Sequence, residues 1–158
     1  MTSPARALEV AHLVTLSALA GAVVLDPTAP SRRAPDYAGW LTGQQRVDRV
    51  MSRLAPPLFL SATATALVAG VVALLQGRPG PATGRILAAG CVVAAVVVTL
   101  RVNEPANERL RGWHPTDEPP ADWRDVRHRW DRAHGLRRGL VAASAAAAGI
   151  GLLLDRWA

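Results

Sequence analysis

Four long apolar blocks dominate this chain of 158 residues, and polar residues are concentrated between them. The blocks cover residues 5–25, 57–76, 84–103 and 137–154. A helix needs about 20 apolar residues to cross the hydrocarbon core of a bilayer. A helix that is apolar on every side is buried or faces lipid. The pattern therefore predicts an all-α fold, a four-helix transmembrane bundle in which residues 1–158 form a single integral membrane domain.

Two further helical features are expected outside the hydrocarbon region. Residues 40–54 place apolar side chains on one face and polar side chains on the other, which predicts an amphipathic helix in the first loop. Pro56-Pro57 is then expected to open the second span. The last helix is predicted to begin after Pro119-Pro120 and to run to Leu154, a length of about 50 Å at 1.5 Å per residue. This extended helix is longer than a bilayer is thick, so its first third must project from it.

The basic residues predict the orientation of the bundle. The net charge is +6, and all 18 basic residues are arginines. Fourteen of them lie in or beside the connections between the first and second blocks and between the third and fourth. Basic residues mark cytoplasmic loops. We therefore expect the protein to lie in the cytoplasmic membrane, with both long loops on the cytoplasmic side and both termini on the outer side. Interleaved acids and the lack of lysine argue against nucleic-acid binding, and predict interface anchors and ion pairs instead.

One face of the last helix carries a polar and aromatic stripe at spacings of four and three residues. Its members are Trp123, Arg127, Trp130, His134 and Arg137. Asp131 is three residues before His134 and four after Arg127, so it is within reach of both. A carboxylate that fixes the tautomer of an imidazole predicts a general base at His134. The alternative is structural: Asp131 forms an ion pair with Arg127 or Arg138, while His134 and the tryptophans anchor the helix at the interface.

A second polar group ends the third block. Asn103 and Asn107 are four residues apart, with Glu104 and Pro105 between them. Proline bends a helix and frees backbone carbonyls, so these side chains could bind a polar ligand, polarise a carbonyl or ligate a metal. The alternative is a helix end at which Glu104 pairs with Arg101 or Arg137.

Metal ligation would require several helices. No His-x-x-x-His or Cys-x-x-Cys pair is present in the sequence. Glu104 and His134 with a third group are the candidate ligands, with copper or iron as the candidate metals. His12 is the most remote candidate, because it lies deep in the first span. A polar residue inside a span is nevertheless a functional candidate.

The same residues carry a resemblance to a known family. Residues 105–110 read Pro-Ala-Asn-Glu-Arg-Leu and are followed by Trp123, Arg127, Trp130, His134 and Arg137. This pattern resembles the anthrone oxygenase-like family of small four-span membrane proteins. The resemblance implies an oxygenase that converts an activated methylene of an aromatic polyketide to a carbonyl with O2. It also implies site residues at Asn107, Trp130, His134 and Arg137.

Together these features predict a membrane-embedded oxygenase that acts on an activated C–H bond of a small aromatic substrate, with O2 as co-substrate. The expected catalytic residues are His134, Asp131 and Glu104. The expected substrate-binding residues are Asn103, Asn107, Trp130, Arg127 and Arg137. The alternative is a non-enzymatic membrane protein whose arginine-rich loops bind a partner or anionic lipid; in either case the chain could form a homo-oligomer.

Overall fold

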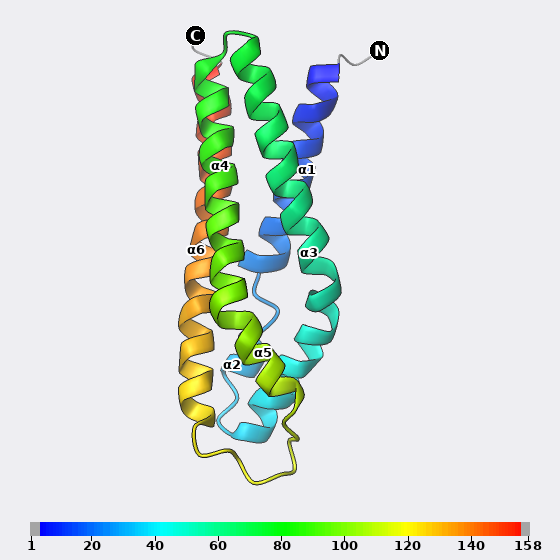
Figure 1. Cartoon of the computed structure of the whole chain (residues 1–158), viewed down its shortest axis with the longest axis vertical. Coiled ribbons are helices and arrows are strands. Elements are labelled where there is room, and N and C mark those ends of the chain that lie inside the picture. Colours follow the sequence, from blue (N-terminus) through cyan, green and yellow to red (C-terminus); the bar gives the residue numbers. More distant parts are fainter. Residues whose placement is uncertain (1–3, 156–158) are drawn as a thin grey trace.

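The computed structural model describes residues 4–155, and among these it contains helices and no strand (Figure 1). The elements in chain order are α1 (Pro4–Val24), α2 (Ala29–Arg32), α3 (Tyr37–Leu75), α4 (Pro79–Val98), the π-helix η1 (Thr99–Asn103), α5 (Glu104–Arg111) and α6 (Trp123–Asp155). Four helical stretches are long and apolar enough to cross a membrane. Large apolar side chains on their outer surfaces are exposed, as expected for helices that face lipid. The predicted all-α transmembrane bundle is confirmed.

The bundle has two different ends (Figure 1). Both termini and the short turn between α3 and α4 lie at one end. The opposite end, called the loop end below, contains α2, α5 and the connection between α5 and α6. The last helix extends into the loop end, as the absence of proline after Pro120 predicts.

The third helix differs from the expected arrangement. Residues 40–54 are helical, but they do not form a separate element, because α3 runs without interruption over 39 residues. Pro56 and Pro57 therefore lie inside this helix rather than at its start. A proline within a helix removes a backbone hydrogen bond and favours a bend. In Figure 1 the N-terminal half of α3 turns beneath the bundle, where it closes the loop end.

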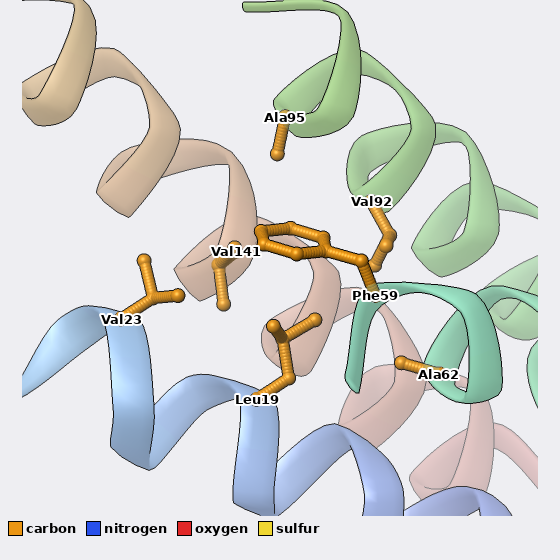
Figure 2. Packing of buried hydrophobic residues seen from close by; sticks show 7 residues of the cluster. All are labelled: Leu19, Val23, Phe59, Ala62, Val92, Ala95 and Val141. Atoms are coloured by element: carbon orange, nitrogen blue, oxygen red, sulfur yellow. The ribbon is translucent and has the colours of Figure 1, made fainter. Parts of the chain in front are cut away.

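The central core combines side chains from all four long helices (Figure 2). Its buried members are Leu19, Val23, Phe59, Ala62, Val92, Ala95 and Val141. Phe59 is the sole phenylalanine of the chain, and its ring lies among the aliphatic groups of the other three helices. This core lies in the middle of the bundle and adjoins the loop end.

Glycines bring α4 and α6 into backbone contact. A Cβ atom added at Gly84 would lie 2.7 Å from the carbonyl oxygen of Ala147 and 2.8 Å from the Cα of Gly151. Small residues allow membrane helices to approach closely, and their association is driven by packing rather than by the hydrophobic effect. Ser144 adds a hydrogen bond across the same interface, from its Oγ to the carbonyl of Ala88 at 2.9 Å.

An aromatic cluster fixes the start of α6 against the start of α3. Trp123 contacts Tyr37 edge-on at a centroid distance of 5.6 Å and lies 5.8 Å from Trp40. Leu110 of α5 is buried in the same cluster. The Nε2 of Gln45 donates to the carbonyls of Leu110 and Trp113 at 2.7 and 2.9 Å, which ties the α5–α6 connection to α3. The loop end is therefore a packed structure that can hold side chains in fixed positions.

Candidate functional site

A cavity of about 660 Å³ opens between the helices at the loop end. This volume is within the range of ligand-binding sites. Its apolar wall includes Phe59, Leu60, Val93, Val96, Val97 and Leu100. Its polar lining includes Thr28, Gln44, Asp48, Glu104, Asn107, Trp130, His134 and Arg137. The sequence-predicted residues Glu104, Asn107, Trp130, His134 and Arg137 are thus brought together around one cavity.

His134 is buried, and both of its ring nitrogens have partners. Arg137 lies one helical turn further along α6, and its Nη2 donates to Nδ1 of His134 at 2.7 Å. Since a guanidinium can only donate, Nδ1 is an acceptor and the ring proton is on Nε2. That nitrogen lies 3.0 Å from Oδ1 of Asp26, to which it donates. The two contacts define a neutral imidazole with a fixed tautomer.

Asp26 is the carboxylate that orients His134, in place of the expected Asp131. Its Oδ1 also accepts hydrogen bonds from the backbone nitrogen and the hydroxyl of Thr28, at 3.2 and 2.5 Å. Its Oδ2 accepts from Arg32 and from Nη1 of Arg138, the latter at 3.2 Å. Asp26 has a φ of 56°, a left-handed conformation that asparagine and aspartate adopt more readily than most residues. This backbone turn ends α1 and directs the carboxylate towards α6.

Trp130 is held on three sides. Its indole Nε1 donates to Oδ1 of Asn107 at 2.8 Å, and its backbone carbonyl accepts from Nδ2 of Asn103 at 3.3 Å. Its ring stacks on that of His134 at a centroid distance of 4.7 Å and an interplanar angle of 16°. The two asparagines were predicted to bind substrate, and in the structure both position Trp130 and through it His134. Asn103 does not line the cavity, although its Oδ1 is buried without a hydrogen-bond partner among the described residues.

Arg127 and Asp131 lie outside the lining of the cavity. Arg127 donates to the backbone carbonyls of Ala34 and Arg32, at 3.1 and 2.5 Å, so it fixes the loop that follows α2. Its Nε is 3.9 Å from Oδ2 of Asp131. This ion pair is the structural alternative that the spacing allowed, and Asp131 makes no hydrogen bond to His134.

Glu104 lines the cavity but is paired with an arginine that the sequence did not indicate. Arg111, at the end of α5, donates to Oε1 of Glu104 at 2.8 Å and to both oxygens of Asp48. The expected partners were Arg101 and Arg137. Many arginines of the loops are engaged in this way within the protein, so fewer are available to a partner or to anionic lipid.

The three candidate metal ligands are not gathered at one point. His12 is buried in α1 without a hydrogen-bond partner for either ring nitrogen, and it does not line the cavity. Val24, at the end of α1, is twelve positions further along the helix, a distance of about 18 Å. Glu104 and His134 both line the cavity, but each is held by protein groups. Within residues 4–155 no three His, Cys, Asp or Glu side chains form a group suited to a metal ion.

Three residues near the cavity escaped the sequence reasoning: Asp26, Thr28 and Gln44. Asp26 directly follows the first apolar block, and Gln44 lies within the predicted amphipathic helix of residues 40–54. The sequence does contain a signal for Asp26. It is an acidic residue at the boundary of an apolar block, where an unpaired charge is costly, so a partner for it should be expected.

The comparisons with known proteins gave one family. A family model described as anthrone oxygenase matches residues 47–147, which are 101 of the 158 residues. The matched segment includes Glu104, Asn107, Trp130, His134 and Arg137, and it begins after Asp26 and Gln44. No curated protein and no solved structure matches the chain.

Proposed function

Because the chain belongs to the anthrone oxygenase family, we propose that it is a membrane oxygenase that uses the cavity at the loop end. The proposed substrate is a small aromatic molecule with an activated C–H bond, and O2 is the co-substrate. The observation that carries this proposal is the position of His134. A histidine with a fixed tautomer lines a largely apolar cavity, at the point where four membrane helices meet a folded loop region.

His134 is the proposed general base, and Nδ1 is the atom that takes the proton. Nδ1 accepts from Arg137 in this structure, so the guanidinium must first turn to another acceptor. An oxygen of the substrate offers such an acceptor. Asp26 stays on the opposite nitrogen and stabilises the imidazolium that forms. In this arrangement the arrival of substrate frees the base.

Arg137 is the proposed donor to the oxygen on which negative charge develops. Preorganised donors of this kind lower the barrier to enolate formation because they need little reorganisation. Asn103 and Asn107 are less suited to this role, since each is bonded to Trp130. Trp130 keeps the plane of the imidazole fixed, and the apolar wall around Phe59 accommodates the ring system of the substrate.

The reaction balances with O2 alone. His134 removes one proton from the methylene, and the resulting carbanion, conjugated with the oxygen bound by Arg137, adds to O2. A proton returned to the distal oxygen gives a hydroperoxide. Loss of the second C–H proton with cleavage of the O–O bond then gives a carbonyl and water. One methylene and one O2 thus become one carbonyl and one water, and no external reductant is needed. Because Glu104 and His134 are already bonded to protein groups, no step is assigned to copper or iron.

Replacement of His134 by alanine tests this assignment. The protein is placed in lipid nanodiscs with anthrone, and the initial rates of O2 uptake and quinone formation are measured against empty nanodiscs. We expect the rate to fall by roughly 100-fold or more, the usual contribution of a positioned general base. His128→Ala is the matched control, because His128 is exposed on the same helix. A His134→Ala protein that keeps most of the rate would show that the base lies elsewhere.

A further inference from the structure

We propose that the cavity opens sideways into the bilayer through a slit between α3 and α4, and that its substrate is an uncharged aromatic molecule that is dissolved in the lipid and enters by this slit. The inference deepens the function proposed above and rests on it for the aromatic character of the substrate. It depends on two rows of side chains that line the cavity and are also exposed on the outer surface of the bundle.

The two rows mark the edges of an opening. Their members are Ser52, Pro56 and Leu60 on α3, and Val93, Val97 and Leu100 on α4 and η1. Within each row the spacing is three or four residues, which places the members on one side of a helix. Leu60 is 73% exposed and Leu100 is 62% exposed, although both line the cavity. A side chain that belongs to the cavity wall and to the outer surface lies at the edge of an opening, so the rows enclose a slit.

The slit lies at the depth of the hydrocarbon. Leu60, Val93 and Val97 belong to helical stretches that can cross a membrane, and no charged side chain belongs to either row. An ion or a strongly hydrated molecule would lose its water at such an opening, which is costly. A neutral fused-ring molecule that is already dissolved in lipid loses none. The slit therefore favours apolar molecules supplied by the bilayer.

The bend of α3 separates it from α4. Near the turn between the two helices they are in close contact, because a Cβ atom added at Gly70 would lie 3.2 Å from the side chain of Ile86. Further towards the loop end, Pro56 and Pro57 interrupt the backbone hydrogen bonding of α3. In Figure 1 the two helices diverge in this direction, and the first half of α3 turns beneath the bundle. The slit is the space that this divergence leaves at the level of the cavity.

The side of the cavity that faces the loops is tied by an ion-pair bridge. Arg111 of α5 binds Asp48 of α3 and Glu104, and both acids line the cavity. A molecule that arrives from water through this side must pass the bridge. One exposed residue of the lining lies outside the two rows, Pro27 in the connection between α1 and α2. The experiment must therefore separate entry from lipid and entry from water.

The reactive groups are set back from the slit. Among the described residues of α6, none that lines the cavity is exposed, and both Trp130 and His134 are buried. A molecule that enters between α3 and α4 passes the apolar wall before it reaches the imidazole. This order keeps water of the bilayer surface away from the base while the substrate enters.

Access of reagents to a thiol inside the cavity tests the route. Val23 lines the cavity and is 4% exposed, so Val23→Cys in a Cys91→Ala background gives a single thiol that is reached through an opening of the cavity. The protein is placed in nanodiscs of neutral phosphatidylcholine, in which water reaches both ends of the bundle, and is labelled without O2. N-(1-pyrenyl)maleimide, which dissolves in lipid, should label the thiol. A sulfonated maleimide, which stays in water, should leave it unmodified.

Variants at the slit sharpen the test. Leu60→Trp narrows the opening and should slow labelling by the pyrenyl reagent about 10-fold or more, which corresponds to about 1.4 kcal/mol in the barrier. Leu100→Trp, at the opposite edge, should have the same effect. Leu67→Trp is the matched control, because Leu67 is exposed on α3 seven residues further along but does not line the cavity. Arg111→Gln breaks the ion-pair bridge and should not speed the labelling.

Four results would overturn the proposal. They are comparable labelling by the sulfonated reagent, faster labelling in Arg111→Gln, equal rates in Leu60→Trp and Leu67→Trp, and a thiol that reacts only after denaturation in dodecyl sulfate. The labelling requires no turnover. The expected pattern in a protein that does not oxidise anthrone would refute the oxygenase and leave the lipid route standing, whereas turnover of anthrone with labelling from water would do the reverse.

Discussion

At the level of single residues, Asp26 fixes the tautomer of His134 and joins three elements of the loop end by hydrogen bonds. It accepts hydrogen bonds from two arginines, a threonine and His134, although its side chain is only 4% exposed. The carboxylate both neutralises the buried guanidiniums and keeps the proton of His134 on Nε2. It also connects the end of α1 to α6, because Arg138 donates in addition to the carbonyl of Val24 at 3.0 Å.

Asp26→Asn separates the charge of this residue from its shape. Asparagine also tolerates the left-handed backbone, so the turn is kept while the negative charge and one acceptor oxygen are lost. Removing one partner of a buried ionic network typically costs about 3 kcal/mol, and we expect a clearly lower melting temperature in nanodiscs. Asp125→Asn is the control, since Asp125 is exposed. Unchanged melting of Asp26→Asn would mean that the network contributes little to stability.

The stripe on α6 shows what a sequence can predict at this level. Helical spacing placed Trp130, His134 and Arg137 on one face, and the structure has all three at the cavity. The partner of His134 was assigned to Asp131, within the same helix, because local spacing is the only distance that a sequence provides. Asp26 lies 108 positions away, and its approach to His134 depends on how α1 ends and how the bundle closes.

At the level of the helices, the contact between α4 and α6 sets the geometry of the bundle. The small residues Gly84 of α4 and Gly151 of α6 are in backbone contact. The continuity of α3 through Pro56 and Pro57 was not predicted. A pair of prolines favours a helix start in isolation, but packing of the N-terminal half of α3 against α5 and α6 keeps the helix continuous.

Gly84→Ala tests whether this approach limits stability. The added methyl group would meet backbone atoms at 2.7–2.8 Å, so the helices must separate. Overpacking of this kind costs about 1–3 kcal/mol, which should appear as a reduced melting temperature. Gly90→Ala on the same helix has open space around it and should be neutral or slightly stabilising. Equal stability of the two variants would show that α4 and α6 can move apart freely.

At the scale of the whole molecule, the two ends are chemically different. The termini and the α3–α4 turn lie at one end, and the cavity and the long loops lie at the other (Figure 1). Fourteen of the 18 arginines lie in or beside the connections at the loop end. We therefore expect the cavity to face the cytoplasm, although acids that pair with these arginines are concentrated at the same end.

Cysteine labelling tests this orientation. Cys91 is the single cysteine, so Cys91→Ala provides a background without thiols. Into it we would place Glu118→Cys in the α5–α6 connection or Gln76→Cys in the α3–α4 turn, both exposed positions. A membrane-impermeant maleimide should label Gln76→Cys in intact cells and Glu118→Cys only after permeabilisation. The opposite pattern would invert the topology.

The π-helix η1 is a place where the chain can change length without moving the loop end. A π-turn contains one more residue than the α-turn it replaces, and such turns are frequent at functional sites. Deleting one residue within this turn would therefore give an α-turn and leave α5 in nearly the same orientation, with Asn107 still at the indole of Trp130. The same deletion in the regular part of α4 would rotate the following segment by about 100° and break this contact. Two homologues can therefore differ by one gap at this turn and keep the same site geometry.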